Sequence, residues 1–306
     1  MKRPSRARRI AAALALGAVL VAAVFLFLFL ILTTARPSGR VVPAHAPDLA
    51  NGETLFHAGG CIGCHEPPSG AEDAGLPTGG ASFPTPMGTF YPGNLTPDPD
   101  TGIGRWTAEA FLDAMTEGVS PDGRHYFPAF PYTSYRNMRV EDMLDLRAYL
   151  MSLPPVRSSQ RDPDIAMVGL ARRTMGLWKR LAFRGRGFRI DPERSATWNR
   201  GAYLVQGPGH CGECHTPRNA LMILDDARRL EGGAHPGGEG QVPSLRDLLG
   251  RGRYKDVADL TLAMQFGETF GYDKLSSGGM AEVQMNLARL PEADLRAISE
   301  YLLSLH

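Results

Sequence analysis

The chain has 306 residues, of which 43% are hydrophobic, so it is long enough for two folded domains of about 100 to 150 residues each. Its 33 Lys and Arg residues nearly balance its 32 Asp and Glu residues, which excludes a protein that binds nucleic acid through a strongly basic overall composition. The 35 glycines and 24 prolines exceed the usual combined share of about 12%. This composition predicts loops that wrap something other than a large aliphatic core.

The N-terminus combines a basic segment with a long apolar stretch. Five basic residues lie within residues 1–9, and no charged residue occurs from Ile10 to Leu32. A helix of about 20 apolar residues crosses a membrane, and basic residues before it favour a cytoplasmic N-terminus. We therefore predict a cytoplasmic basic segment at 1–9, a transmembrane anchor at 10–32 and a linker at 33–47. A cleaved signal peptide ending near Ala46 is the alternative that the sequence leaves open.

All four cysteines fall in two copies of one motif, Cys-x-x-Cys-His. The first copy has Cys61, Cys64 and His65, and the second has Cys211, Cys214 and His215. Two thiols three residues apart on one helical turn can bond to one edge of a porphyrin, which places the following histidine at the iron. The motifs therefore predict two covalently bound haem c groups, with His65 and His215 as axial iron ligands.

Other uses of paired cysteines fit this sequence less well. A thioredoxin-like redox pair requires a βαβ context, which the sequence lacks, and needs no histidine. A four-cysteine zinc site usually has its two cysteine pairs about 15 to 20 residues apart, far less than the separation of Cys64 and Cys211.

An internal repeat supports two domains of one plan. A short apolar helix is expected before each motif, and an amphipathic helix ends each half, at 142–153 and 294–305. Tyr149 and Tyr301 occupy equivalent places in these last helices, and we interpret them as packing residues. Helices are also predicted from Thr107 to Glu117 and from Asp256 to Phe266, each followed by a glycine. Because no strand pattern of any length is present, the predicted fold is mostly α.

Beyond the haem motifs, the sequence resembles the cytochrome c subunits of membrane-bound alcohol and gluconate-type dehydrogenases. The resemblance extends from about residue 48 to 306. It rests on five runs, at 94–106, 118–124, 128–135, 198–205 and 214–219. The resemblance implies two tandem cytochrome c domains, at 48–155 and 198–306, that relay electrons without substrate chemistry of their own.

The segment between these domains, 156–197, is predicted to be a basic amphipathic connector. Its centre, 166–189, mixes apolar residues with many arginines and lysines. We expect a helix that packs its apolar side on the two domains and turns its basic side to solvent. Contact with anionic lipid or with a partner protein remains the alternative.

A methionine opposite the histidine raises the potential of a haem, so the sixth ligand matters. In the second half Met280 is the expected ligand, because Gly278 and Gly279 precede it and the related pattern also has methionine there. In the first half Phe130 stands where the related pattern has methionine. Met87 stands where that pattern usually has an aromatic residue, so coordination by Met87 and simple packing of its side chain both remain open, with Met138 as a third candidate.

The predicted function is electron transfer from a periplasmic or membrane-bound dehydrogenase to quinone or an oxidase-side acceptor. The chain would be a single-pass protein of the bacterial cytoplasmic membrane, with its haem domains in the periplasm and with lipid contact through the N-terminal helix. No catalytic residue and no nucleic-acid partner are expected. The alternative is an enzyme, such as a di-haem peroxidase, that uses an open iron site on the first haem.

Overall fold

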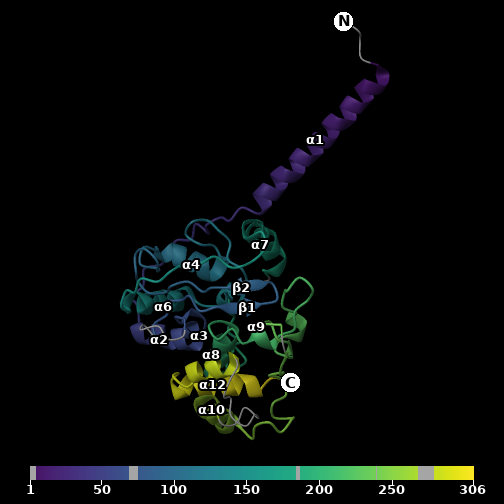
Figure 1. Cartoon of the computed structure of the whole chain (residues 1–306). Coiled ribbons are helices and arrows are strands. Elements are labelled where there is room, and N and C mark those ends of the chain that lie inside the picture. The colour runs from purple at the N-terminus through teal and green to yellow at the C-terminus, as the bar shows by residue number, and fades with distance from the viewer. Residues whose placement is uncertain (1–4, 69–74, 184–186, 239, 268–278) are drawn as a thin grey trace.

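The computed structural model describes residues 5–68, 75–183, 187–238, 240–267 and 279–306. The described chain is mostly helical, as the sequence predicts. One long helix, α1 (Arg6–Leu32), projects from a globular part that the rest of the chain forms (Figure 1). Ser5 caps α1, and none of its residues is buried. The helix is long and apolar enough to cross a membrane, a property that anchors and signal sequences share.

Residues 33–47, between α1 and the globular part, make hydrogen bonds to the globular part. The backbone N–H of Ser38 donates a hydrogen bond to Asp113 Oδ2 over 3.0 Å. Further along, His45 Nε2 lies 2.6 Å from Asp145 Oδ1. The segment is therefore fixed against the surface of the first half.

The first half is built on two crossing helices, α2 (Leu49–Ala58) and α6 (Val140–Ser152). Asp48 starts α2 by accepting hydrogen bonds from the N–H groups of Ala50 and Asn51. The helix α4 (Ala108–Glu117) packs beside them, with Thr107 as its N-cap and left-handed Gly118 at its end, as predicted. Their shared core includes Leu55, Phe56, Phe111, Leu112, Met143, Leu146 and Leu150.

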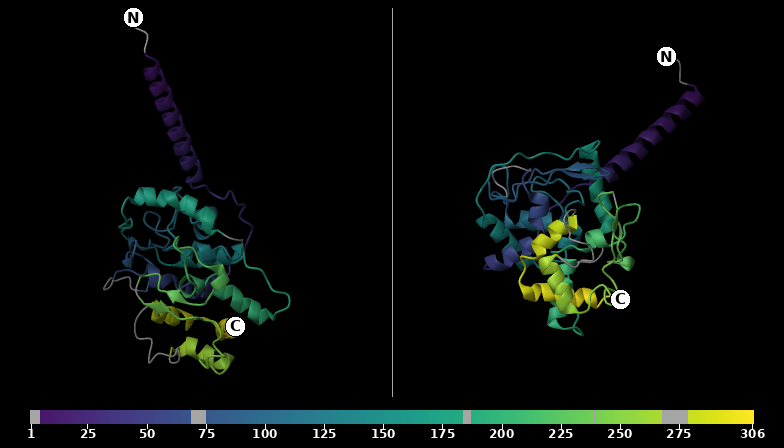
Figure 2. Two further views of the ribbon diagram at one scale, coloured as in Figure 1. Left: turned by 90° about the vertical axis from the view of Figure 1, so that its right-hand side faces the viewer. Right: turned by 60° about the horizontal axis from the view of Figure 1, so that its bottom comes forward.

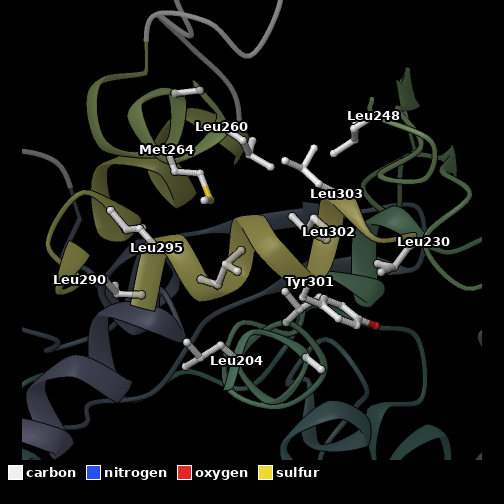
Figure 3. Packing of buried hydrophobic residues seen from close by; sticks show 14 of the residues in the cluster. Leu204, Leu230, Leu248, Leu260, Met264, Leu290, Leu295, Tyr301, Leu302 and Leu303 are labelled. Carbon is white, nitrogen blue, oxygen red and sulfur yellow. The ribbon is translucent and has the colours of Figure 1, made fainter. Parts of the chain in front are cut away.

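The second half repeats this plan with α8 (Ala196–Gln206) crossing α12 (Glu292–Leu303). The helix α10 (Val257–Phe266) covers α12 and lies between Asp256 as N-cap and Gly267, which confirms the predicted helix. Figure 3 shows the core around α12, where Leu204 approaches from one side and Leu260 and Met264 from the other. Tyr301 is buried there, in agreement with its expected packing role, and its ring lies 5.1 Å from that of Trp198.

The remaining elements complete the described chain. They are α3 (Cys61–His65), α5 (Tyr132–Tyr135), α7 (Val168–Ala182), α9 (Gly212–His215), a 3-10 turn at Asp226–Arg228, and α11 (Gly279–Leu287). Two antiparallel pairs, β1 (Phe83–Thr85) with β2 (Gly88–Phe90) and β3 (Gly233–Ala234) with β4 (Gln241–Val242), add a small amount of sheet to the mostly α fold that the sequence predicts. Strands of two or three residues are too short to show a repeating apolar pattern in sequence.

The two halves contact each other where α6 begins, beside α8. Tyr203 of α8 donates a hydrogen bond to Asp142 of α6 and accepts one from the N–H of Arg139 over 3.2 Å. Asn137 Nδ2 donates to the carbonyl of Gln206 over 3.0 Å. Polar contacts therefore join the same elements that carry the two cores.

The connector helix α7 has the opposite orientation from the expected one. Lys179 is buried, and its Nζ donates to the carbonyls of Glu117 and Gly118, each over 2.6 Å. These carbonyls end α4, and the carbonyl end of a helix attracts cations. Leu170, Leu177 and Leu181 are instead exposed. The three leucines of α7 therefore face away from the globular part, whereas Trp178 Nε1 donates a hydrogen bond to the carbonyl of Leu221 over 2.7 Å.

A glycine at each helix crossing is expected to be required for stability. A Cβ at Gly52 would overlap the backbone of Asp145, and one at Gly201 would overlap the carbonyl of Ala297. We expect Gly52→Ala and Gly201→Ala each to lower the free energy of unfolding by about 1 to 3 kcal/mol, measured by denaturant unfolding of the holoprotein.

Gly169→Ala in α7 is the matched control, because nothing lies within 4 Å of the added carbon. Its higher helix propensity should raise stability by up to about 1 kcal/mol. Equal gains in all three variants would show that the crossings are not tight.

Candidate haem sites

Each Cys-x-x-Cys-His motif forms a single helical turn. Cys61, Cys64 and His65 lie in α3, while α9 starts directly after Cys211. The preceding residue is left-handed in both cases, Gly60 with φ 55° and His210 with φ 37°. This conformation is costly for a residue with a side chain. His210 is held by a 3.1 Å hydrogen bond from its Nε2 to the carbonyl of Gly59, so the second motif is fixed against the first.

Both motif histidines make the same hydrogen bond. His65 Nδ1 lies 2.6 Å from the carbonyl oxygen of Gly93, and His215 Nδ1 lies 2.8 Å from that of Pro243. Each acceptor is 28 residues after its histidine. Because a carbonyl can only accept, Nδ1 must carry the proton, which leaves the Nε2 lone pair for a metal.

The burial of these histidines favours the same state. Desolvation lowers the pKa of His65 and of His215, and the hydrogen bond to the carbonyl opposes this shift in each case. Both imidazoles are therefore neutral near pH 7, which is the form that binds iron.

The cysteines do not resemble a redox pair. No disulfide joins any of the four. Burial raises the pKa of both the Cys61 and the Cys211 thiol to about 12. A reactive Cys-x-x-Cys pair instead has a lowered cysteine pKa, because the thiolate is the nucleophile. Each of these buried thiols lies three residues before a partially exposed second thiol, and an oriented histidine follows. This arrangement fits covalent attachment of a porphyrin.

Glu213, inside the second motif, links the two halves and was not identified from the sequence. Its Oε1 accepts hydrogen bonds from Thr133 over 2.6 Å and from Ser134 over 2.7 Å, both in α5 of the first half. Its Oε2 pairs with Arg218 at 2.6 Å. The only signal in the sequence was a charged residue where the first motif has glycine, and its partners are 79 and 80 residues away.

The carbonyls of Gly93 and Pro243 were also not identified. A backbone oxygen has no signature in sequence, but the equal spacing of 28 residues in two halves of one plan offered a signal. Aligning the halves on their motifs would have paired these two positions.

The structure places the candidate sixth ligands on separate elements. Met280 is partly buried near the start of α11, a helix that contacts the first half, where Asn286 Oδ1 lies 3.5 Å from His57 Nδ1. Met87 is half exposed in the turn between β1 and β2. Phe130 packs edge-on against Tyr135 at 5.6 Å, within the first core. Gly278, which supported the assignment of Met280, lies outside the described residues.

Comparison with known proteins identifies the family. The cytochrome c family model matches residues 49–154. A diheme c-type cytochrome of Cereibacter sphaeroides is 41% identical over 256 residues, which cover 83% of this chain and 85% of that protein. The chain belongs to the diheme c-type cytochrome family. Two haem c groups are therefore its cofactors.

Other relatives are parts of dehydrogenases. The fructose dehydrogenase cytochrome subunit of Gluconobacter japonicus is 35% identical over 85% of this chain. The cytochrome c subunit of the quinone-type alcohol dehydrogenase of Gluconacetobacter polyoxogenes is 36% identical over 86% of it. The matched region spans 53% of the first protein and 58% of the second. The resemblance inferred from the sequence, to dehydrogenase cytochrome subunits, is confirmed.

Removing the Glu213 carboxylate should weaken the contact between the halves. Glu213→Ala leaves the largely buried Arg218 guanidinium without its ion-pair partner, so we expect a loss of about 3 kcal/mol in the free energy of unfolding. Glu53→Ala, at an exposed position of α2, should change stability by less than about 0.5 kcal/mol. Denaturant unfolding would measure both changes, and a Glu213→Ala protein as stable as the control would show that this cluster does not join the halves.

Proposed function

We propose that this cytochrome transfers electrons through two haems. Cys61, Cys64 and His65 hold the first haem, and the equivalent residues of the second motif hold the other. The observation that carries this assignment is the shared orientation of His65 and His215, each held by a carbonyl acceptor 28 residues downstream. A bound haem c supplies a reversible one-electron change at iron.

The chain's own residues position the haems and set their surroundings. The thiols of each motif fix one porphyrin edge, and the neutral histidine presents Nε2 to the iron. The hydrogen bond to the carbonyl keeps each imidazole from rotating and increases its basicity. Because His210 binds the backbone at Gly59, the two attachment turns lie beside each other, which favours electron passage from one haem to the other.

The relatives and α1 support a proposed partner and a proposed location. Relatives named as cytochrome subunits of fructose, alcohol and gluconate dehydrogenases support a dehydrogenase as electron donor. Quinone or an oxidase-side carrier is the proposed acceptor. We assign α1 as an uncleaved anchor in the bacterial cytoplasmic membrane, with the haem domains in the periplasm, because basic residues precede it.

Loss of one attachment site should remove one haem and lower the electron uptake of the chain by one electron. The Cys61→Ser/Cys64→Ser double variant should keep a single haem through acid and organic extraction, because the remaining haem is covalently bound. In a reductive titration it should take up one electron per chain where the parent protein takes up two. Cys211→Ser/Cys214→Ser is the matched variant for the other site. Release of free haem from the parent protein, or rapid turnover of peroxide by it, would contradict this proposal.

We expect the sixth iron ligands of the two haems to come from different parts of the two halves. Met280→Ala should abolish a thioether-to-iron band near the red end of the oxidised spectrum and lower the potential of the second haem, because methionine ligation raises the potential. Met87→Ala should do the same for the first haem if Met87 coordinates it. If Met87 only packs, the parent protein should show a single such band, and its first haem should bind carbon monoxide readily or carry a histidine as its sixth ligand.

Met285→Ala is the control for Met280→Ala, because it lies on the same helix and is exposed. Two bands that persist in both the Met280 and the Met87 variants would exclude both assignments and leave Met138 to be tested.

A further inference from the structure

We propose that α7 lies on the surface of the membrane that α1 enters, with its leucines among the acyl chains and its arginines at anionic phospholipid headgroups. This inference rests on the proposed role of α1 as an anchor. The proposed partner of the exposed side of α7 is the lipid bilayer itself, because α7 contacts the end of α1, the proposed membrane span.

Three leucines form an exposed stripe on α7, which we call the leucine face. At 3.6 residues per turn, Leu170, Leu177 and Leu181 share one side of the helix. They are 48%, 45% and 52% exposed. The side that packs on the globular part is different and carries the buried Gly176 and Lys179. An amphipathic helix with an exposed apolar side and basic residues is typical of helices that lie in a membrane interface.

The position of α7 fits such an interface. Arg173 Nε donates to Thr33 Oγ1 over 3.0 Å, and Arg180 Nε donates to the carbonyl of Leu32 over 3.3 Å. Both acceptors lie where α1 ends. On the helix circumference these two arginines lie between the packed side and the leucine face. The end of α1 therefore lies against α7 between its packed side and the leucine face, which leaves the leucine face uncovered beside the apolar span.

The figures show the same arrangement. In the left view of Figure 2, α7 lies directly below the base of α1 and runs crosswise to it, at the top of the globular part. Figure 1 shows α10 and the C-terminus at the far end from α1. A helix parallel to the membrane and next to the emerging span would have this placement.

The charge of this region suits anionic lipid. The helix α7 contains Arg172, Arg173, Lys179 and Arg180 and no acidic residue. Arg172 pairs with Asp162, and Lys179 is used inside the fold. An open cavity of about 540 Å³ lies between α7 and the end of α1 and is lined by Arg36, Arg136, Arg180, Lys179 and one carboxylate, Glu117, together with Leu32 and Phe183. Guanidinium groups bind phosphate through paired N–H donors, so the cavity suits a phospholipid headgroup.

Labelling from within the bilayer tests this proposal on the full-length holoprotein. The protein is placed in vesicles of phosphatidylethanolamine and phosphatidylglycerol that contain a phospholipid with a photoreactive acyl chain. Peptides are then analysed by mass spectrometry after illumination. We expect labels on α1 and on the peptide covering α7, and most of the α7 labelling should be lost in Leu170→Glu/Leu177→Glu/Leu181→Glu.

The matched control is Leu49→Glu/Leu249→Glu/Leu262→Glu, whose leucines are 49%, 44% and 52% exposed and lie outside α7. Its α7 labelling should equal that of the parent, and unchanged haem absorption should show that both triple variants fold.

The outcomes separate this inference from the proposed anchor. Labelling of α1 without α7 would overturn the inference and leave the anchor intact. Absence of label on both would overturn the anchor and the inference with it. Exchanging phosphatidylglycerol for phosphatidylcholine should reduce α7 labelling, and equal labelling in both lipids would overturn the role assigned to anionic headgroups.

Discussion

The close crossing of two helices in each half is the constraint on which the rest of the structure depends. Where α2 crosses α6 and α8 crosses α12, the backbones approach so closely that only glycine fits, at Gly52 and Gly201. The helices α2 and α8 lead directly into the motif turns, so the crossings fix where each motif turn begins. From that position His65 and His215 reach carbonyls in distant loops that orient their rings. Tertiary packing thus determines the geometry of a site whose residues are contiguous in sequence.

The two halves share this plan but differ where they meet. Glu213 in the second motif has partners in α5 of the first half, whereas the first motif has glycine at the equivalent position. This difference lies at the contact between the halves.

Features with local signals could be predicted from the sequence. The bounds of α4 and α10 follow from capping residues and terminal glycines. The motifs identify both haems because covalent attachment requires two thiols and a histidine at this spacing. The partners of Glu213 and the burial of Lys179 depend on residues far away in the chain, so no local pattern predicts them. The orientation of α7 was predicted wrongly because amphipathicity shows that a helix has two sides but not which one the protein covers.

The fixed course of residues 33–47 has a consequence for encounters between this cytochrome and its partners. Ser38 and His45 tie this segment to Asp113 and Asp145, and Arg173 and Arg180 tie α7 to the end of α1. With α1 as the proposed membrane anchor, these contacts would let the fold set the distance of each haem from the bilayer. A donor that diffuses laterally in the same membrane would then meet the haems at a fixed distance from the bilayer surface. A partner whose redox centre lies at a different distance from that surface would be too far from either haem for electron transfer, even without an unfavourable contact.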